Sequence, residues 1–241
     1  MYSQCVPHTG SSSSTLIRRT HKSDLIGKLS WKGSLTLYES FCKSAKQNLD
    51  RRCLGQRPVD TLNGTAGLFL FRTYAEILRS IRCTASGLVK EGLIMPNSDG
   101  LLTLGIYMKN CSAWIVAENA CYYLNAVVVP LYDTLGPDTI EFIVNQTGLQ
   151  TIVCSSKELA SLAAVAHKCP TLRAVVVTDL SVPHTVCSQV MKAANIQVVS
   201  LHDLERIGDA YPTDPRPPQP TDIATICYTS GTTGKVNNTE D

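Results

Sequence analysis

The chain has 241 residues, of which 44% are apolar and 17% are charged, and its formal net charge is +2. This composition is typical of a folded protein with one large domain or two small ones, and it excludes an intrinsically disordered chain. The small net charge also argues against a nucleic-acid-binding surface, so we expect no nucleic-acid partner.

Ten cysteines and five histidines are scattered along the chain, and no two cysteines form a C-x-x-C pair. In a chain of mixed helices and strands, this pattern is typical of buried thiols in a reducing compartment. Disulfides and zinc sites require cysteines at paired spacings, which are missing here. We therefore predict an intracellular protein without a metal site.

Residues 1–35 are rich in serine and in basic residues, and Asp24 is their single acidic residue. Acid-poor amino ends of this kind are found both in disordered tails and in organelle transit peptides. We favour a disordered tail and keep a targeting segment as the alternative.

The longest apolar stretch, residues 113–132, is interrupted by Glu118, Asn119, Asn125 and Pro130. A membrane-spanning helix needs about twenty predominantly apolar residues. The stretch is therefore better explained as a helix followed by a buried strand, and we predict no transmembrane segment.

Two capping-box patterns open the first predicted helices. The first, at Thr36 and Glu39, precedes an apolar helical face formed by Leu37, Phe41, Ala45 and Leu49. The second, at Thr73 and Glu76, follows a short predicted strand at 68–71. It opens a helix that we expect to end near Gly92, with an apolar face formed by Ile77, Ile81, Ala85 and Leu88.

The remainder of the chain alternates regularly between strands and helices. Pro137 occupies a position typical of the first turn of a helix. The predicted elements are strand 101–107, helix 112–124, strand 127–129, helix 137–147, strand 150–154, helix 156–168, strand 173–178, helix 186–194, strand 195–200 and helix 201–207. This alternation, with continuous valine and isoleucine runs, predicts an α/β fold with a mostly parallel sheet flanked by helices on both faces.

A Pro-rich connector from Pro212 to Pro220 leads into a last predicted strand at 222–227. The next residues read Tyr-Thr-Ser-Gly-Thr-Thr-Gly, from Tyr228 to Gly234. Glycines allow backbone N–H groups to converge on an anion, and the hydroxyl groups add further donors. In parallel sheets, ligands bind beyond the carboxyl ends of the strands, so this loop is a candidate site for a nucleotide phosphate.

Two other interpretations of the loop compete with a phosphate site. A Walker-type loop fails on spacing, because Thr229 stands where its first glycine belongs and Val236 follows Lys235 where a serine or threonine is required. A surface loop without a ligand is the common outcome for a short Gly/Ser/Thr segment, but seven residues match a known pattern here.

The loop resembles the phosphate loop of adenylate-forming enzymes, the acyl-CoA synthetase superfamily. Further motifs resemble the long-chain fatty-acid–CoA ligases of that superfamily: C-L-G-Q-R-P at 53–58, G-I-Y-M-K-N at 105–110 with Trp114, V-P-L-Y-D-T-L-G at 129–136 and D-I-A-T-I-C at 222–227. The resemblance extends from about residue 36 to 234. Trp114, the Tyr122-Tyr123 pair, Tyr132 and Asp133 also have a purely structural interpretation, as packing or turn residues.

The resemblance implies a two-step reaction. A long-chain fatty acid is activated by ATP and Mg²⁺ to an acyl-adenylate, and coenzyme A then forms the thioester. It implies that Tyr228, Thr229, Ser230, Gly231, Thr232, Thr233 and Gly234 bind the ATP phosphates. It also implies the cytoplasmic face of the endoplasmic reticulum, the peroxisome or lipid droplets as the location, with at most peripheral membrane association.

The chain departs from the family pattern directly after the loop. The family continues G-x-P-K-G, whereas Val236 and Asn237 follow Lys235 here, so the proline and lysine of the pattern are missing. The family's magnesium-coordinating Thr-Glu pair, its ribose-binding aspartate and its catalytic lysine are also missing, and we assign no catalytic residue. We expect a truncated amino-terminal fragment with a partial AMP-binding domain at 36–235, a connector at 209–220 and a divergent tail at 236–241.

Two functions follow from these patterns. The first is a long-chain fatty-acid–CoA ligase by ancestry, inactive as these 241 residues alone. The second is a non-catalytic α/β fragment that acts only through a binding partner or against a longer form. Chain-length preference and oligomeric state have no signal in the sequence.

Overall fold

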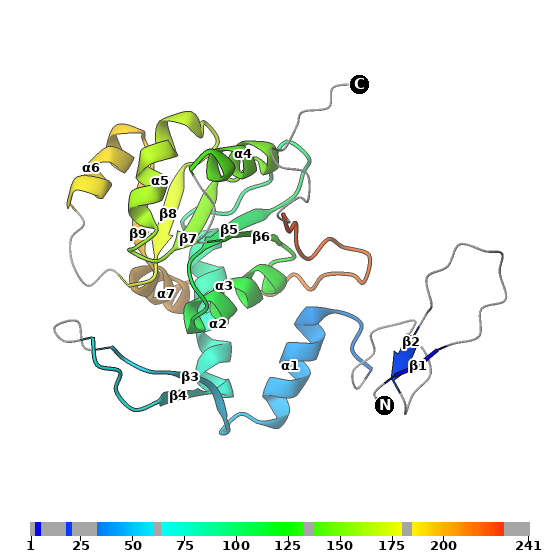
Figure 1. The fold of residues 1–241 in the computed structure, drawn as a ribbon. Helices are drawn as coiled ribbons and strands as arrows, with labels where there is room; N and C mark the ends of the chain where they lie inside the picture. Colours follow the sequence, from blue (N-terminus) through cyan, green and yellow to red (C-terminus); the bar gives the residue numbers. More distant parts are fainter. Residues whose placement is uncertain are drawn as a thin grey trace, which may run out of the picture.

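The computed structural model describes residues 3–5, 18–20, 33–59, 64–132, 137–179 and 185–228. Its centre is a five-stranded sheet in the order β6-β5-β7-β8-β9, and every neighbouring pair is parallel. The strands are β5 (Thr103–Tyr107), β6 (Val127–Leu131), β7 (Thr151–Cys154), β8 (Ala174–Val177) and β9 (Gln197–Ser200). The predicted parallel α/β fold is confirmed (Figure 1).

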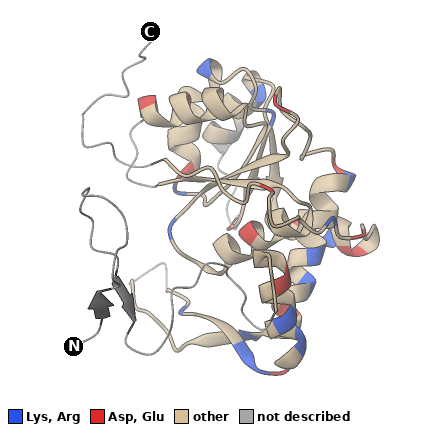
Figure 2. Ribbon diagram, turned by 90° about the vertical axis from the view of Figure 1, so that its right-hand side faces the viewer, with Lys and Arg blue, Asp and Glu red and all other residues tan. Residues whose placement is uncertain are grey.

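Helices cover both faces of the sheet (Figure 1). One face packs against α2 (Tyr74–Lys90), α3 (Ser112–Tyr123) and α7 (Leu201–Ala210). The other packs against α4 (Pro137–Thr147), α5 (Leu159–Val165) and α6 (Thr185–Ala193). Successive strand residues point to opposite faces, and both faces are covered, so β6 and β8 are apolar and buried throughout and β5 and β7 are buried throughout. The edge strand β9 is less buried and has polar residues at both ends. Figure 2 shows that charged residues lie on the helices and connections and not on these strands.

Helix α1 (Leu37–Gln47) lies outside the two layers that sandwich the sheet and has Ala45 as its single buried residue. The Thr36 hydroxyl caps it by accepting a hydrogen bond from the Glu39 N–H at 3.1 Å. The Glu39 carboxylate, however, accepts from the Leu35 N–H at 2.8 Å, so the predicted capping box is only half formed. The helix ends at Gln47, and Leu49 does not extend its apolar face as expected.

The second predicted capping box is complete. Thr73 and Glu76 exchange hydrogen bonds at the start of α2, and α2 ends just before Gly92, which has a positive φ of 63°. Glycine adopts this left-handed conformation without strain, which explains the helix end.

A two-stranded antiparallel ribbon precedes α2, formed by β3 (Arg52–Gln56) and β4 (Leu70–Thr73). The strand predicted at 68–71 is therefore displaced by two residues, and β3 was not predicted. The Arg57 guanidinium donates to the carbonyls of Gly67 and Ala66 at 2.7 and 2.9 Å and so holds the two arms together. Leu68 and Leu70 remain 88% and 65% exposed.

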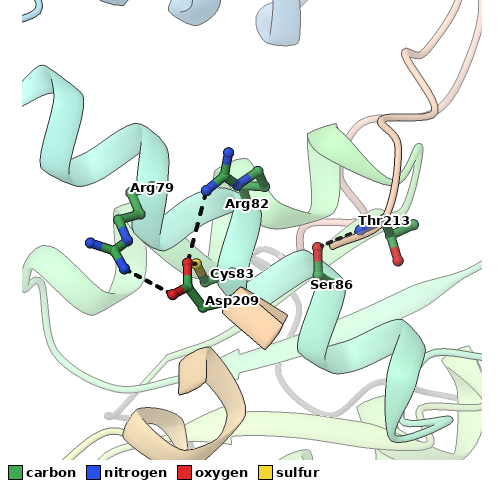
Figure 3. A network of polar contacts seen from close by, with 6 residues as sticks. All are labelled: Arg79, Arg82, Cys83, Ser86, Asp209 and Thr213. Carbon is green, nitrogen blue, oxygen red and sulfur yellow. Dashed lines mark hydrogen bonds and ion pairs between the residues drawn. The ribbon is translucent and has the colours of Figure 1, made fainter. Parts of the chain in front are cut away.

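Helices α2 and α7 cross so closely that their backbones are in van der Waals contact. A Cβ at Gly208 would lie 1.8 Å from the Cys83 carbonyl oxygen, and one at Gly87 would lie 2.3 Å from the Leu204 carbonyl oxygen. Polar contacts flank the crossing, as Figure 3 shows: Arg79 donates to Asp209 at 2.8 Å and the Thr213 N–H donates to the Ser86 hydroxyl at 3.0 Å.

Two predicted elements differ in length from those observed. The helix expected at 156–168 is the shorter α5 with a 3-10 turn at Ala166–Lys168, because Asp179 accepts from the Ser156 N–H and hydroxyl and keeps that residue in a turn. Helix α7 extends to Ala210 rather than to 207, because its last turns pack on α2 through Gly208.

The strand predicted at 222–227 is reduced to one parallel bridge between Thr225 and Val128. The Val128 N–H donates to the Ala224 carbonyl at 3.0 Å, and the Ile226 N–H donates to the Val128 carbonyl at 2.9 Å. The next donor along β6 would be the N–H of residue 130, which is a proline and has none. Pro130 therefore ends the ladder after one step.

The amino end of the chain contains a short antiparallel pair, β1 (Ser3–Cys5) with β2 (Arg18–Thr20). Most of residues 1–35 lie outside the described residues, so the disordered or targeting tail stays a prediction. Within the part of the chain that the structure describes, no helix is long and apolar enough to cross a membrane.

Candidate phosphate-binding site at the carboxyl edge of the sheet

The carboxyl ends of the parallel strands lie along one edge of the sheet. The register pairs Tyr107 with Leu131 and with Cys154, and Cys154 with Val177, so these strands end level with one another. Strand β6 lies on one side of β5 and β7 on the other, and the chain passes from β5 to β6 through α3 and from β6 to β7 through α4, on opposite faces of the sheet. Crevices at such a change of direction are where α/β sheets bind ligands.

The extended segment 224–226 runs beside β6 in the same direction and delivers Tyr228 to this edge. The Tyr228 hydroxyl donates to the Gln146 side-chain oxygen at 2.6 Å, and its ring packs edge-on against Phe142 with centroids 6.1 Å apart. Both partners belong to α4. Partial burial raises the pKa of Tyr228, which keeps the hydroxyl protonated as a donor.

A second contact holds the same edge together. The Tyr132 hydroxyl and the Cys227 thiol lie 3.1 Å apart, and both side chains are exposed. The hydrogen bond to Cys227 raises the pKa of Tyr132. The segment that enters the candidate loop is thus attached to β6 through its backbone, to Tyr132 directly after β6 through Cys227, and to α4 through Tyr228.

A sequence model of the family described as AMP-binding enzyme matches residues 43–236. The chain belongs to the AMP-binding enzyme family. The match includes β3 through β9 and the segment that carries Tyr228.

Curated relatives of this family member are long-chain acyl-CoA synthetases. It is 37% identical over 199 residues to Long chain acyl-CoA synthetase 6, peroxisomal, of Arabidopsis thaliana and 32% identical over 202 residues to Long-chain-fatty-acid–CoA ligase 1 of Homo sapiens. Each alignment covers 83% of this chain and 27% of the relative. The chain thus spans about a quarter of the length of these relatives.

Solved structures share the fold of this family member. The adenylation domain of a carboxylate reductase from Mycobacterium chelonae matches with a TM-score of 0.66 and 20% identity, covering 82% of this chain and 32% of that domain. The anthranilate CoA ligase AuaEII in complex with anthranoyl-AMP matches with a TM-score of 0.63 and 15% identity, with the same coverage. These likenesses support the fold alone.

The family motifs occupy different structural settings in this AMP-binding family member. Of the candidate phosphate-binding residues, Tyr228 is placed, whereas Thr229, Ser230, Gly231, Thr232, Thr233 and Gly234 lie outside the described residues. Gly105 lies in β5, where a Cβ would come within 2.8 Å of the Ile152 side chain, so its function there is close packing. Trp114 and Tyr123 pack against the core on the α2–α3 face, as their structural interpretation predicts.

Sequence reasoning missed the two α4 residues that hold Tyr228. Phe142 and Gln146 lie four residues apart, which places them on one face of the helix. Their spacing is visible in the sequence, but no pattern indicates that the partner is a tyrosine 82 positions away.

The surface beside Tyr228 carries both acidic and basic side chains. An open hollow of about 770 Å³ is lined on α4 by Asp138, Glu141 and the two Tyr228 partners, and Lys168 donates to Glu141 at 3.0 Å. Within the described ranges, no group of three or more acidic, histidine or cysteine side chains could hold a metal ion.

Proposed function

We propose that this chain supplies the ATP-phosphate-binding part of a long-chain fatty-acid–CoA ligase. The observation that carries the proposal is the attachment of residues 224–228 to β6 and α4, because the motif from Thr229 to Gly234 begins at the carboxyl edge where such sheets bind ligands. The names of the curated relatives support the same substrate class, a long-chain fatty acid.

In this proposal, ATP is the substrate whose α-phosphorus accepts the fatty carboxylate, with pyrophosphate as the leaving group. The chain contributes hydrogen-bond donors to the β- and γ-phosphates: the hydroxyls of Ser230, Thr232 and Thr233 and the backbone N–H groups at Gly231 and Gly234. These donors stabilise the negative charge that develops on the leaving pyrophosphate.

Tyr228 has a supporting part in this arrangement. Its hydroxyl proton already points to Gln146 and its ring contacts Phe142, so the side chain holds the start of the loop rather than donating to a phosphate. The Cys227–Tyr132 contact restrains the preceding residue in the same way.

The donor set fits a phosphate chain but does not fit a complete Mg²⁺ site. Magnesium prefers carboxylate oxygens and water, and the described part of the chain brings no three or more such side chains together in a metal-binding group. In this proposal, binding of Mg²⁺ and coenzyme A rests on the family alone.

The proposed location is intracellular, on the surface of an organelle. Two of the relatives, both from Arabidopsis thaliana, are named as peroxisomal, which supports the peroxisome as one such site. In this proposal, association with a membrane is peripheral, and residues 1–35 contribute any targeting signal. The endoplasmic reticulum and lipid droplets remain part of the family-based proposal.

A second candidate function is that of a non-catalytic partner-binding module. The coverage of 27% of the relatives favours it for the 241 residues on their own. Such a module would fold and associate with a partner without binding ATP. A measurement of ATP binding therefore distinguishes the two candidate functions.

That measurement is calorimetric titration of the purified chain with ATP. Three or four charge-assisted hydrogen bonds of roughly 1.5–3 kcal/mol each, less ordering costs, correspond to a dissociation constant on the order of 1 mM. We expect Ser230→Ala to weaken binding and Ser44→Ala, on the distant helix α1, to leave it unchanged. No ATP binding would support the non-catalytic module instead. Equal ATP binding by both variants would show that ATP binds away from this loop and would contradict the phosphate-loop proposal.

A further inference from the structure

A cavity of about 380 Å³ lies between α1, α2 and α3, on the far side of α2 from the sheet. Its size is within the range of small-molecule sites. It exists because α1 is held away from the other two helices by aromatic side chains: the rings of Tyr38 and Tyr123 meet edge-on with centroids 6.2 Å apart, and those of Phe41 and Tyr74 lie 6.3 Å apart.

The wall of this cavity, called the α1 cavity below, is mostly apolar. Side chains from both sides of the gap contribute, namely Tyr38, Phe41, Leu49, Ala75, Leu78 and Ile81. The neutral polar groups of the wall already have partners: Asn119 donates to the Ile115 carbonyl at 2.9 Å and the Tyr123 hydroxyl donates to the Thr213 carbonyl at 2.7 Å. A ligand in the α1 cavity would therefore contact hydrocarbon over most of its surface.

Two arginines, Arg79 and Arg82, are the charged residues of the wall. Their side chains are 67% and 51% exposed, so the guanidinium groups lie at the mouth of the cavity and not in its interior. Among the residues that the structure describes, no acidic side chain lines the cavity. The neighbouring carboxylates, Asp209 and Asp214, lie outside the wall.

The two guanidinium groups share one carboxylate, as Figure 3 shows. Arg79 donates to Asp209 at 2.8 Å, whereas the contact from Arg82 to the other oxygen of Asp209 is 3.9 Å, too long for a hydrogen bond. Arg82 therefore keeps donors that an incoming anion can use. A guanidinium binds a carboxylate or a phosphate through two parallel hydrogen bonds, which a neutral head group cannot match.

We propose that the α1 cavity binds a single-chain anionic amphiphile, with the alkyl chain between α1 and α2 and the carboxylate or phosphate head on Arg82 at the mouth. The apolar wall selects the alkyl chain, and the Arg82 guanidinium, which makes no hydrogen bond to Asp209, selects a negatively charged head. This site goes beyond the function proposed above and does not depend on residues 229–234.

The test is calorimetric titration of the 241-residue chain, below micelle-forming concentrations, with dodecanoate, dodecyl phosphate and neutral dodecyl maltoside. We expect one molecule of an anionic ligand to bind per chain, and the tighter of the two anions identifies the head group. The maltoside should bind at least about tenfold more weakly, because it lacks the charge-assisted pair. No binding of either anion, or equal binding of the maltoside, would overturn the proposal.

Variants locate the site. Arg82→Gln should weaken binding of the anions by about tenfold or more. Arg206→Gln should leave it unchanged, because Arg206 lies on α7, pairs there with Asp203, and is not among the residues that line the cavity. Ala75→Phe should abolish binding by filling the cavity.

Asp209→Asn separates a binding role from mere destabilisation. Removing the carboxylate that competes for Arg82 should tighten binding of the anions, although the variant loses a contact of the fold. Unchanged affinity in both Arg82→Gln and Ala75→Phe, or weaker binding in Asp209→Asn, would show that the amphiphile does not occupy this cavity.

Discussion

Replacing Gly208 by alanine tests whether the close crossing of α2 and α7 is a structural requirement. A Cβ at this position would lie 1.8 Å from the Cys83 carbonyl oxygen and 2.6 Å from the Gly87 nitrogen. Real Cβ atoms essentially never approach closer than 3.0 Å, and the obstructing atoms belong to the backbone of a buried helix, so α7 would have to move outward by more than an ångström.

Such a displacement of α7 would disturb contacts beyond Gly208 and Gly87. It pulls on the Arg79–Asp209 ion pair and on the Thr213–Ser86 hydrogen bond, and it opens the core around buried Leu204. Overpacking of this kind costs about 1–3 kcal/mol or more, and lost core contacts add to it. Alanine returns about 1 kcal/mol through its better helix propensity. We therefore expect a net loss of about 2–4 kcal/mol in the free energy of unfolding.

The measurement is the urea-unfolding midpoint together with the melting temperature. The expected loss corresponds to a decrease in the melting temperature on the order of 5–15 °C for a chain of this size. Gly100→Ala is the matched control, because its Cβ would meet nothing within 4 Å and only its positive φ of 76° is strained, at a cost of about 1–2 kcal/mol. If Gly208→Ala unfolds at the same urea concentration as wild type, the crossing is looser than described.

The hydrogen bond from Arg79 lowers the pKa of Asp209, so the ionised Asp209 stabilises the fold above the ordinary aspartate pKa, and this stabilisation is lost as pH falls through the lowered value. Asp209→Asn should remove this part of the acid dependence of the melting temperature, and an unchanged acid profile would contradict the prediction. Leu68→Ser with Leu70→Ser should reduce aggregation in light scattering with little loss of stability, since both side chains are mostly exposed; a large drop in melting temperature would mean that the ribbon packs elsewhere. In an ATP- and coenzyme-A-dependent assay with palmitate or oleate, these 241 residues alone should give no acyl-CoA above background. Positioning of the substrates lowers the activation barrier by roughly 7–11 kcal/mol, and the chain covers only about a quarter of the length of its relatives. Turnover that Ser230→Ala abolishes would refute this prediction.

The sequence predicted the layered fold well, because its signals there are local or periodic. Thr73 with Glu76 sets the start of α2, and continuous apolar runs such as Val127–Val129 identify strands buried on both faces. Predictions failed where a distant partner decides. The one-step ladder at Thr225 depends on Pro130, and the end of α7 depends on Gly87 in another helix.

The same distinction holds for the candidate site. The motif from Tyr228 to Gly234 was visible in the sequence, as was its position after an extended segment. The anchoring of Tyr228 by Phe142 and Gln146 depends on how α4 packs beside β6, for which the sequence has no local signal. The α1 cavity was equally invisible, because it arises from aromatic contacts between helices rather than from any one of them.

Alkylation of Cys227 tests the central claim most directly, since this exposed thiol lies directly before Tyr228, the first residue of the proposed phosphate loop. The rate of its modification by iodoacetamide would be followed by mass spectrometry with ATP, pyrophosphate or AMP present. The phosphate-loop account predicts that ATP and pyrophosphate slow the reaction, that AMP does not, and that Ser230→Ala removes the protection. Equal rates with and without ATP in the wild-type chain would contradict a phosphate site at this edge of the sheet.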